Sequence, residues 1–190
     1  MAAVVLPRAG ADLRRQLADA FVWRTDRGED RSYADLTGWW RDPAILAWLG
    51  AGLAGLYGDA APTVVVGPQS RGVLLGSLTA VALGVGFVEA RKNPAPAADS
   101  DAWVRRRTAP DYRDRQVEFG FRRDLIRAGD RVLMVDDWVA TGATALAVRG
   151  LVADRGAHWI GVAAVVDALV EPQLRRRLPV HALLHERDLR

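Results

Sequence analysis

Short apolar runs alternate along the chain with segments whose apolar residues recur every three or four positions. The runs have the length and composition of strands buried on both faces of a sheet. They cover residues 63–66, 85–90, 132–135, 158–167 and 180–184. The intervening segments have helical spacing and cover residues 43–58, 73–83 and 144–155. This alternation predicts an α/β fold with a doubly wound, mostly parallel sheet and right-handed crossovers.

The first part of the chain is more polar and less regular. Asp42 and Pro43 mark the start of a helix, since Asp is a favoured N-cap and Pro fits the first turn. Gly58 is expected to end that helix. Before it, the pattern predicts an amphipathic helix, then a short strand or hydrophobic anchor, then a polar loop. These cover residues 11–20, 21–23 and 24–32. Residues 1–41 are therefore expected to form a small N-terminal hood on a single domain of residues 1–190.

Residues 93–115 interrupt the alternation. They contain few large apolar residues, three prolines and an arginine run at 105–107. The segment is too long for an ordinary connection, so it is either disordered or a flexible flap over a functional site. Residues 116–121 alternate weakly and are expected to form a strand.

Composition narrows the class of protein. Half of the 190 residues are hydrophobic, about a quarter are charged and none is cysteine, so we expect a globular chain without disulfides. Neither a secretory leader nor an apolar run long enough to span a membrane is visible, which predicts a cytoplasmic protein. A net charge of +3 suits an anionic ligand and is weak support for nucleic-acid binding. The basic residues are 25 Arg and one Lys, Lys92, which is either a chance survivor or a position that needs an ammonium group.

Candidate chemistry is concentrated after the run at 132–135. Two carboxylates, Asp136 and Asp137, follow the predicted strand directly. Small and hydroxyl residues at 140–144 then precede the next predicted helix. Free backbone N–H groups and the positive end of a helix dipole bind phosphate, while carboxylates accept hydrogen bonds from sugar hydroxyls. The stretch therefore predicts a sugar-phosphate site; an ordinary strand–turn–helix is the alternative.

This stretch closely resembles the phosphoribosyl-diphosphate signature of type I phosphoribosyltransferases, in which an apolar strand and two acids precede a Thr-Gly-Gly-Thr-like loop. Ala143 stands where the second glycine is most common. The resemblance implies that Asp136 and Asp137 hold the ribose hydroxyls. It also implies a loop for the 5′-phosphate, consisting of Ala140, Thr141, Gly142, Ala143 and Thr144.

Two further loops resemble the diphosphate site of the adenine branch of that family. Ser70, Arg71 and Gly72 match a Ser-Arg-Gly loop, and Gln69 replaces the acid before it. The resemblance implies a cis peptide between Gln69 and Ser70. The pair Arg91 and Lys92 resembles the basic pair that ends the following strand. Because carboxyl ends of parallel strands meet at one sheet edge, these loops should converge with residues 136–144. Solvated loop side chains are the alternative for each.

Three further residues are assigned by resemblance alone. Asp111 resembles the acid of the acid–Tyr pair that ends the mobile flap, and it would act near the base nitrogens or be a solvated carboxylate. Tyr33 falls where an aromatic residue stacks on the base. Trp138 falls where the family places an apolar residue under the base, and packing alone would also explain it.

The implied activity is transfer of ribose 5-phosphate from phosphoribosyl diphosphate to a purine, most closely adenine, with release of diphosphate. The implied cofactor is Mg²⁺ held mainly by substrate and water, with no dedicated metal ligands, and the implied assembly is a homodimer that binds neither nucleic acid nor membrane. Two alternatives stay open. One is a regulator that binds phosphoribosyl diphosphate with little or no catalysis, and the other is a transferase for another base, such as guanine, xanthine or a non-purine.

Overall fold

The computed structural model describes residues 11–25, 27–28, 32–94, 100–109 and 116–189. A sheet of seven strands in the order β5-β6-β4-β3-β7-β8-β9 forms the centre of the fold. The strands are β3 (Val64–Pro68), β4 (Gly86–Lys92), β5 (Trp103–Arg107), β6 (Glu118–Arg122), β7 (Arg131–Val139), β8 (His158–Asp167) and β9 (Val180–His185). The five strands β4, β3, β7, β8 and β9 pair in parallel, in that order. β5 and β6 add an antiparallel edge beside β4. The predicted doubly wound, mostly parallel α/β fold is therefore confirmed.

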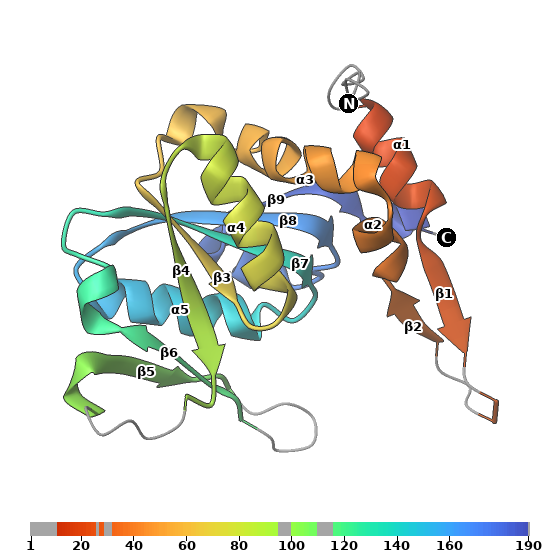
Figure 1. The fold of residues 1–190 in the computed structure, drawn as a ribbon. Coiled ribbons are helices and arrows are strands. Elements are labelled where there is room, and N and C mark those ends of the chain that lie inside the picture. Colours follow the sequence, from red (N-terminus) through yellow and green to blue (C-terminus); the bar gives the residue numbers. More distant parts are fainter. Residues whose placement is uncertain (1–10, 26, 29–31, 95–99, 110–115, 190) are drawn as a thin grey trace.

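Helices cover both faces of this sheet (Figure 1). Alternate residues of each strand point to opposite faces, so the core divides into two clusters. Val65, Leu133 and Val135 belong to the cluster beneath α3 (Pro43–Gly55) and α4 (Arg71–Leu83). Neighbouring strand residues such as Met134 belong to the cluster beneath α5 (Ala143–Asp154). Burial on both faces explains the continuous apolar runs in the sequence.

The N-terminal segment forms a separate small layer at one end of the sheet (Figure 1). Its elements are α1 (Ala11–Asp19), the antiparallel hairpin of β1 (Val22–Thr25) and β2 (Ser32–Asp35), and α2 (Thr37–Arg41). The Trp39 indole is fully buried and donates a hydrogen bond of 2.8 Å to the carbonyl of Leu17. The Trp23 indole donates one of 2.7 Å to the carbonyl of Leu189, at the end of the chain. The hood is thus fixed to the last described turn.

Several predicted boundaries are wrong by a few residues. Asp42 does cap α3, since its carboxylate accepts hydrogen bonds from the backbone of Ala44 and Ile45, but the helix ends at Gly55 rather than Gly58. Residues 24 and 25 belong to β1 instead of the predicted loop. The largest difference is β5, which lies inside the segment that the sequence pattern leaves without a strand. Its residues pair with β6, a contact between distant segments that a local pattern does not reveal.

Candidate functional site

The loops after β3, β4 and β7 lie together at the carboxyl edge of the sheet, as predicted. A polar cavity of about 380 Å³ lies there, lined by the loop after β3, the last residues of β4 and β7, and the first residues of α4 and α5. Its lining residues are Gln69, Ser70, Arg71, Lys92, Asp136, Asp137, Trp138 and Thr144. A smaller cavity of about 150 Å³ adjoins it and is lined by residues 134, 136 and 138–145. Asp136, Trp138 and Thr144 line both cavities, so the two form one continuous site.

The smaller cavity has the geometry of an anion site. It lies at the start of α5, whose N-cap residue, Gly142, has no side chain to cap the helix. The first N–H groups of a helix lack intrahelical partners and carry the positive end of the dipole, which is the arrangement that binds phosphate. One of them, the N–H of Ala143, is 3.4 Å from the hydroxyl of Thr141.

Gly142 and Ala143 explain how this loop tolerates a departure from two glycines. Gly142 has φ of 70°, a left-handed conformation that suits glycine. Ala143 is already the first residue of α5. The left-handed position falls on residue 142, so a Cβ at residue 143 introduces no backbone strain.

Asp136 and Asp137 are the last acidic residues of β7 and point to different neighbours. Asp136 is half-buried and accepts a hydrogen bond of 2.9 Å from the backbone N–H of Asp137. Burial, and after it the charge of Asp137, raise the pKa of Asp136 well above the ordinary carboxyl value, while the ammonium of Lys92 acts in the opposite direction. The site therefore holds one carboxyl that resists ionisation beside one that is paired with a cation.

That cation is Arg71, at the start of α4. Its Nη1 lies 2.7 Å from Oδ2 of Asp137, and the Arg71 side chain is 52% exposed while that of Asp137 is 12% exposed. The contact joins the predicted diphosphate loop to the predicted ribose acids. Because its guanidinium is half exposed, Arg71 keeps donors available to a ligand in the polar cavity.

The loop before α4 has the predicted cis peptide, between Gln69 and Ser70. The side-chain carbonyl of Gln69 accepts a hydrogen bond of 3.0 Å from the backbone N–H of Lys92. Gln69 thereby ties the loop to the end of β4. Gly72 is required by packing, since a Cβ there would lie 2.5 Å from Cδ of Pro68 and 2.9 Å from the carbonyl of Val135.

Lys92 and Arg91 have different environments. Lys92 lines the polar cavity, and its Nζ lies 6.0 Å from the centroid of the Phe119 ring. Arg91 does not line that cavity, and its Nε is 3.4 Å from a carboxylate oxygen of Glu89. Adjacent residues of a strand point to opposite faces, so only one of the pair reaches the site in this conformation.

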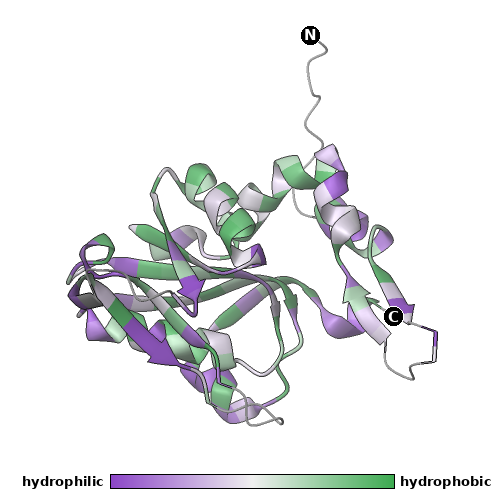
Figure 2. Ribbon diagram, turned by 60° about the horizontal axis from the view of Figure 1, so that its bottom comes forward, coloured by the Kyte–Doolittle hydropathy of each residue, from purple (hydrophilic) through white to green (hydrophobic). Residues whose placement is uncertain are grey.

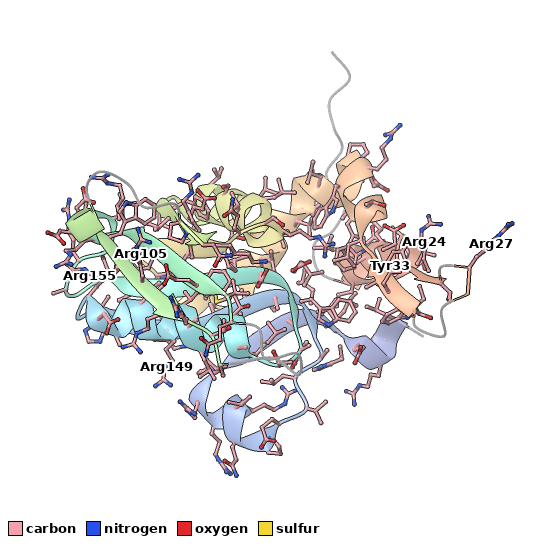
Figure 3. All side chains as sticks on the ribbon, turned by 90° about the horizontal axis from the view of Figure 1, so that it is seen from below. Arg24, Arg27, Tyr33, Arg105, Arg149 and Arg155 are labelled. Carbon is pink, nitrogen blue, oxygen red and sulfur yellow. The ribbon has the colours of Figure 1, made fainter. Side chains whose placement is uncertain are left out.

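Trp138 connects the site to the hood. Its ring is edge-on to Trp23, with centroids 6.0 Å apart, and tilted against Phe21 at 6.1 Å. Tyr33 lies elsewhere: it is 49% exposed, beside Arg24 on the β1–β2 hairpin, and lines neither cavity (Figure 3). The aromatic surface next to the site therefore comes from β7 and β1.

Some residues that line the site have no sequence signal, and one predicted site residue is not described by the structure. Asp111 lies outside the described residues. Met134 and Val139 also line the smaller cavity, although the sequence places Met134 in a buried strand and assigns no role to Val139. The sequence pattern predicts only a short strand or hydrophobic anchor at residues 21–23. Phe21 and Trp23 pack against Trp138, and these three aromatic residues are here called the aromatic wall.

Comparisons with known proteins agree on one family. The family described as "Phosphoribosyl transferase domain" matches residues 42–183. The adenine phosphoribosyltransferase of Nitrosospira multiformis is 36% identical over 140 residues, covering 71% of this chain and 74% of that protein. The xanthine phosphoribosyltransferase of Brevibacillus brevis is 33% identical over 129 residues, covering 66% of this chain and 64% of that protein. The crystal structure of adenine phosphoribosyltransferase from Rhodothermus marinus has a TM-score of 0.77 at 31% identity, covering 93% of this chain and 99% of that chain.

Proposed function

The chain belongs to the phosphoribosyltransferase family, and from that premise we propose that it transfers ribose 5-phosphate from phosphoribosyl diphosphate to adenine. One observation carries the proposal. A single continuous site combines the start of α5 with its glycine N-cap, an acid pair, and the cations Arg71 and Lys92. These groups match a substrate with a phosphate at one end, a diol in the middle and a diphosphate at the other.

The division of charge suggests how the chain would act. The loop at 140–144 would bind the 5′-phosphate through backbone N–H groups. Asp136 and Asp137 would accept hydrogen bonds from the ribose hydroxyls and lie near the positive charge of an oxocarbenium-like transition state. Arg71, Lys92 and the backbone around Gln69 and Ser70 would stabilise the departing diphosphate.

Substrate binding would rearrange the contact between Arg71 and Asp137. The guanidinium of Arg71 pairs with the carboxylate of Asp137 at 2.7 Å. A bound diphosphate would compete for Arg71, and the ribose hydroxyls would replace it on Asp137. Arg71 would thus compensate the charge of Asp137 until the substrate binds.

The site fits a Mg²⁺ ion that is held mainly by substrate. Among the described residues there is no group of three or more His, Cys, Asp or Glu side chains that could hold a metal. Among the described residues that line the polar cavity, Asp136 and Asp137 carry the carboxylates. Mg²⁺ commonly binds through one or two carboxylates together with phosphate oxygens and water, and it would neutralise charge on the diphosphate.

The base would lie between the loop after β7 and the hood. Trp138 offers an apolar surface there, supported by Phe21 and Trp23. The role of Tyr33 in stacking, the role of Arg91 at the diphosphate, and the role of Asp111 in a closing flap remain proposals from family resemblance. Xanthine is the second candidate base, because the Brevibacillus relative carries that name.

We also propose that the working form is a homodimer. The sequence has no charged residue from Pro43 to Gly58, which includes all of α3, or from Gly72 to Val88, which includes α4 after its first residue, Arg71. These helices carry mainly apolar and small residues on the outside of the sheet (Figure 2). Val81 is 82% exposed and Leu74 is 41% exposed. An apolar surface of this kind fits a second copy better than solvent.

The described helices include none with the length and apolar character of a membrane span.

Turnover of phosphoribosyl diphosphate with a panel of bases tests the proposed activity. We expect diphosphate release with adenine, and much slower release with guanine, xanthine, hypoxanthine and uracil. Asp137→Asn is the matched inactive control, since it preserves shape while weakening ribose recognition. Tight binding of phosphoribosyl diphosphate without release would indicate the regulator instead, and release with xanthine alone would replace adenine by the second candidate.

A further inference from the structure

The phosphate loop rests on three leucine side chains from the segment after β8. A Cβ built on Gly142 would lie 3.1 Å from Cδ1 of Leu178, 3.5 Å from Cδ1 of Leu169 and 3.6 Å from Cδ1 of Leu174. Leu169 and Leu178 are buried, and Leu174 packs against the same core. These three residues, here called the leucine floor, pack against the loop at Gly142 and are not among the residues that line the smaller cavity.

The leucine floor includes residues before, within and after a helix that is too short to be stable by itself. α6 (Pro172–Arg177) has six residues, and an isolated helix of that length is unstable in water. Its start is capped by Glu171, whose side chain accepts a hydrogen bond of 3.3 Å from the backbone of Gln173. Its position must therefore come from contacts with the rest of the protein.

Asp167 and Arg175 supply such a contact. Asp167 is the last residue of β8 and is 4% exposed. Nη1 of Arg175 donates to its Oδ2 at 2.7 Å, and Nη2 of Arg175 donates to Oδ1 at 3.1 Å. The backbone N–H of Leu169 donates to Oδ1 at 2.9 Å, and Arg175 also donates to the Leu169 carbonyl. The pair thus fixes one leucine of the floor directly and the helix that carries a second.

The same pair is tied to the strand that leads into the phosphate loop. Asp167 is the parallel partner of Val139, the last residue of β7. The next residue, Ala168, donates a backbone hydrogen bond of 2.9 Å to the carbonyl of Val139. Loop, floor and ion pair are therefore one connected unit, although neither Asp167 nor Arg175 lines the phosphate cavity.

We propose that Asp167 and Arg175 are positioning residues for the 5′-phosphate of phosphoribosyl diphosphate, acting through the leucine floor on the loop at 140–144. The proposal rests on the proposed function, because it names what the loop binds. Binding donors must be held by supporting contacts, and a shift of about 1 Å weakens binding or catalysis strongly.

The expected effect has a kinetic signature. Because neither the 5′-phosphate nor its loop takes part in the bond that breaks, we expect the contacts between them to be equally strong in the ground state and the transition state. Losing such uniform binding raises KM and leaves kcat unchanged. For Arg175→Gln we expect KM for phosphoribosyl diphosphate to rise about tenfold, kcat to stay within about twofold and KM for the base to change little.

The experiment compares Arg175→Gln with Arg176→Gln, which removes an exposed arginine from the same helix. Steady-state kinetics would be measured for both, together with calorimetric binding of ribose 5-phosphate. Arg176→Gln should match the wild type in every readout, and Arg175→Lys should recover part of the affinity. Unchanged KM and unchanged ribose 5-phosphate binding in Arg175→Gln would overturn the proposal, as would a loss of kcat alone.

Two further variants keep the test decisive. If Arg175→Gln does not fold, Leu174→Ala shortens the leucine floor at a half-buried position, and the same rise in KM is expected. Asp167→Asn combined with Arg175→Gln should be less damaging than the sum of the single changes, because both break one contact. If the wild type binds ribose 5-phosphate but turns over no base, the transferase proposal fails, while weaker binding by Arg175→Gln still supports the positioning role.

Discussion

Replacing Arg71 by glutamine is the most direct test of how this site is organised. The wild-type guanidinium lies 2.7 Å from the carboxylate of Asp137, whose side chain is 12% exposed. The substitution leaves Asp137 beside Asp136 without its cation. Hydrogen bonds to charged groups contribute about 1.5–3 kcal/mol, and the 52% exposure of Arg71 places this one at the low end. We expect the free energy of unfolding to fall by about 1–2 kcal/mol in urea denaturation.

The same substitution should reduce catalysis more than stability. If Arg71 also holds the departing diphosphate, a lost charged interaction of about 2–3 kcal/mol lowers kcat/KM about 30- to 150-fold. The assay is diphosphate release at varied phosphoribosyl diphosphate. Arg15→Gln is the matched control, because the Arg15 side chain is 72% exposed and pairs with Asp12 at 2.5 Å on α1. It should leave kcat/KM unchanged. A value for Arg71→Gln within threefold of the wild type, with the protein folded, would refute the assigned role.

Three further predictions concern the acid pair, the aromatic wall at Trp138, and the exposed surface of α4. Asp136→Asn should remove most turnover yet stabilise the protein by about 1 kcal/mol at neutral pH. Burial and Asp137 raise the pKa of Asp136, so the folded wild type loses stability as the pH rises from the ordinary carboxyl pKa through the raised one. The stability advantage of Asp136→Asn in urea denaturation should therefore vanish at low pH. An advantage that does not depend on pH would contradict this cause. Trp138→Ala should raise KM for the base at least about tenfold while changing KM for phosphoribosyl diphosphate little, and equal rises in both would argue against a base wall. If the protein is the proposed homodimer, Val81→Glu should make it monomeric in light scattering, whereas a monomeric wild type would remove the homodimer proposal.

The sequence by itself determined the local parts of the site. The run at 132–135 is continuous because β7 is buried on both faces, so strand and acid pair could be read together. Asp42 caps α3, as its residue type predicts. The convergence of three loops also followed from sequence, since the carboxyl ends of parallel strands share an edge.

Only the tertiary structure decided which side chains share a neighbourhood. Arg71 is paired with Asp137, 66 positions further along the chain. Lys92 reaches the polar cavity while Arg91 does not, because the strand continues to residue 92 and alternates its side chains. The support of Gly142 by leucines after β8, and the pairing of β5 with β6, join segments that no local pattern connects. The sequence specifies each element through contacts between near neighbours, but partners that the chain brings together over long distances depend on the packing of the whole sheet.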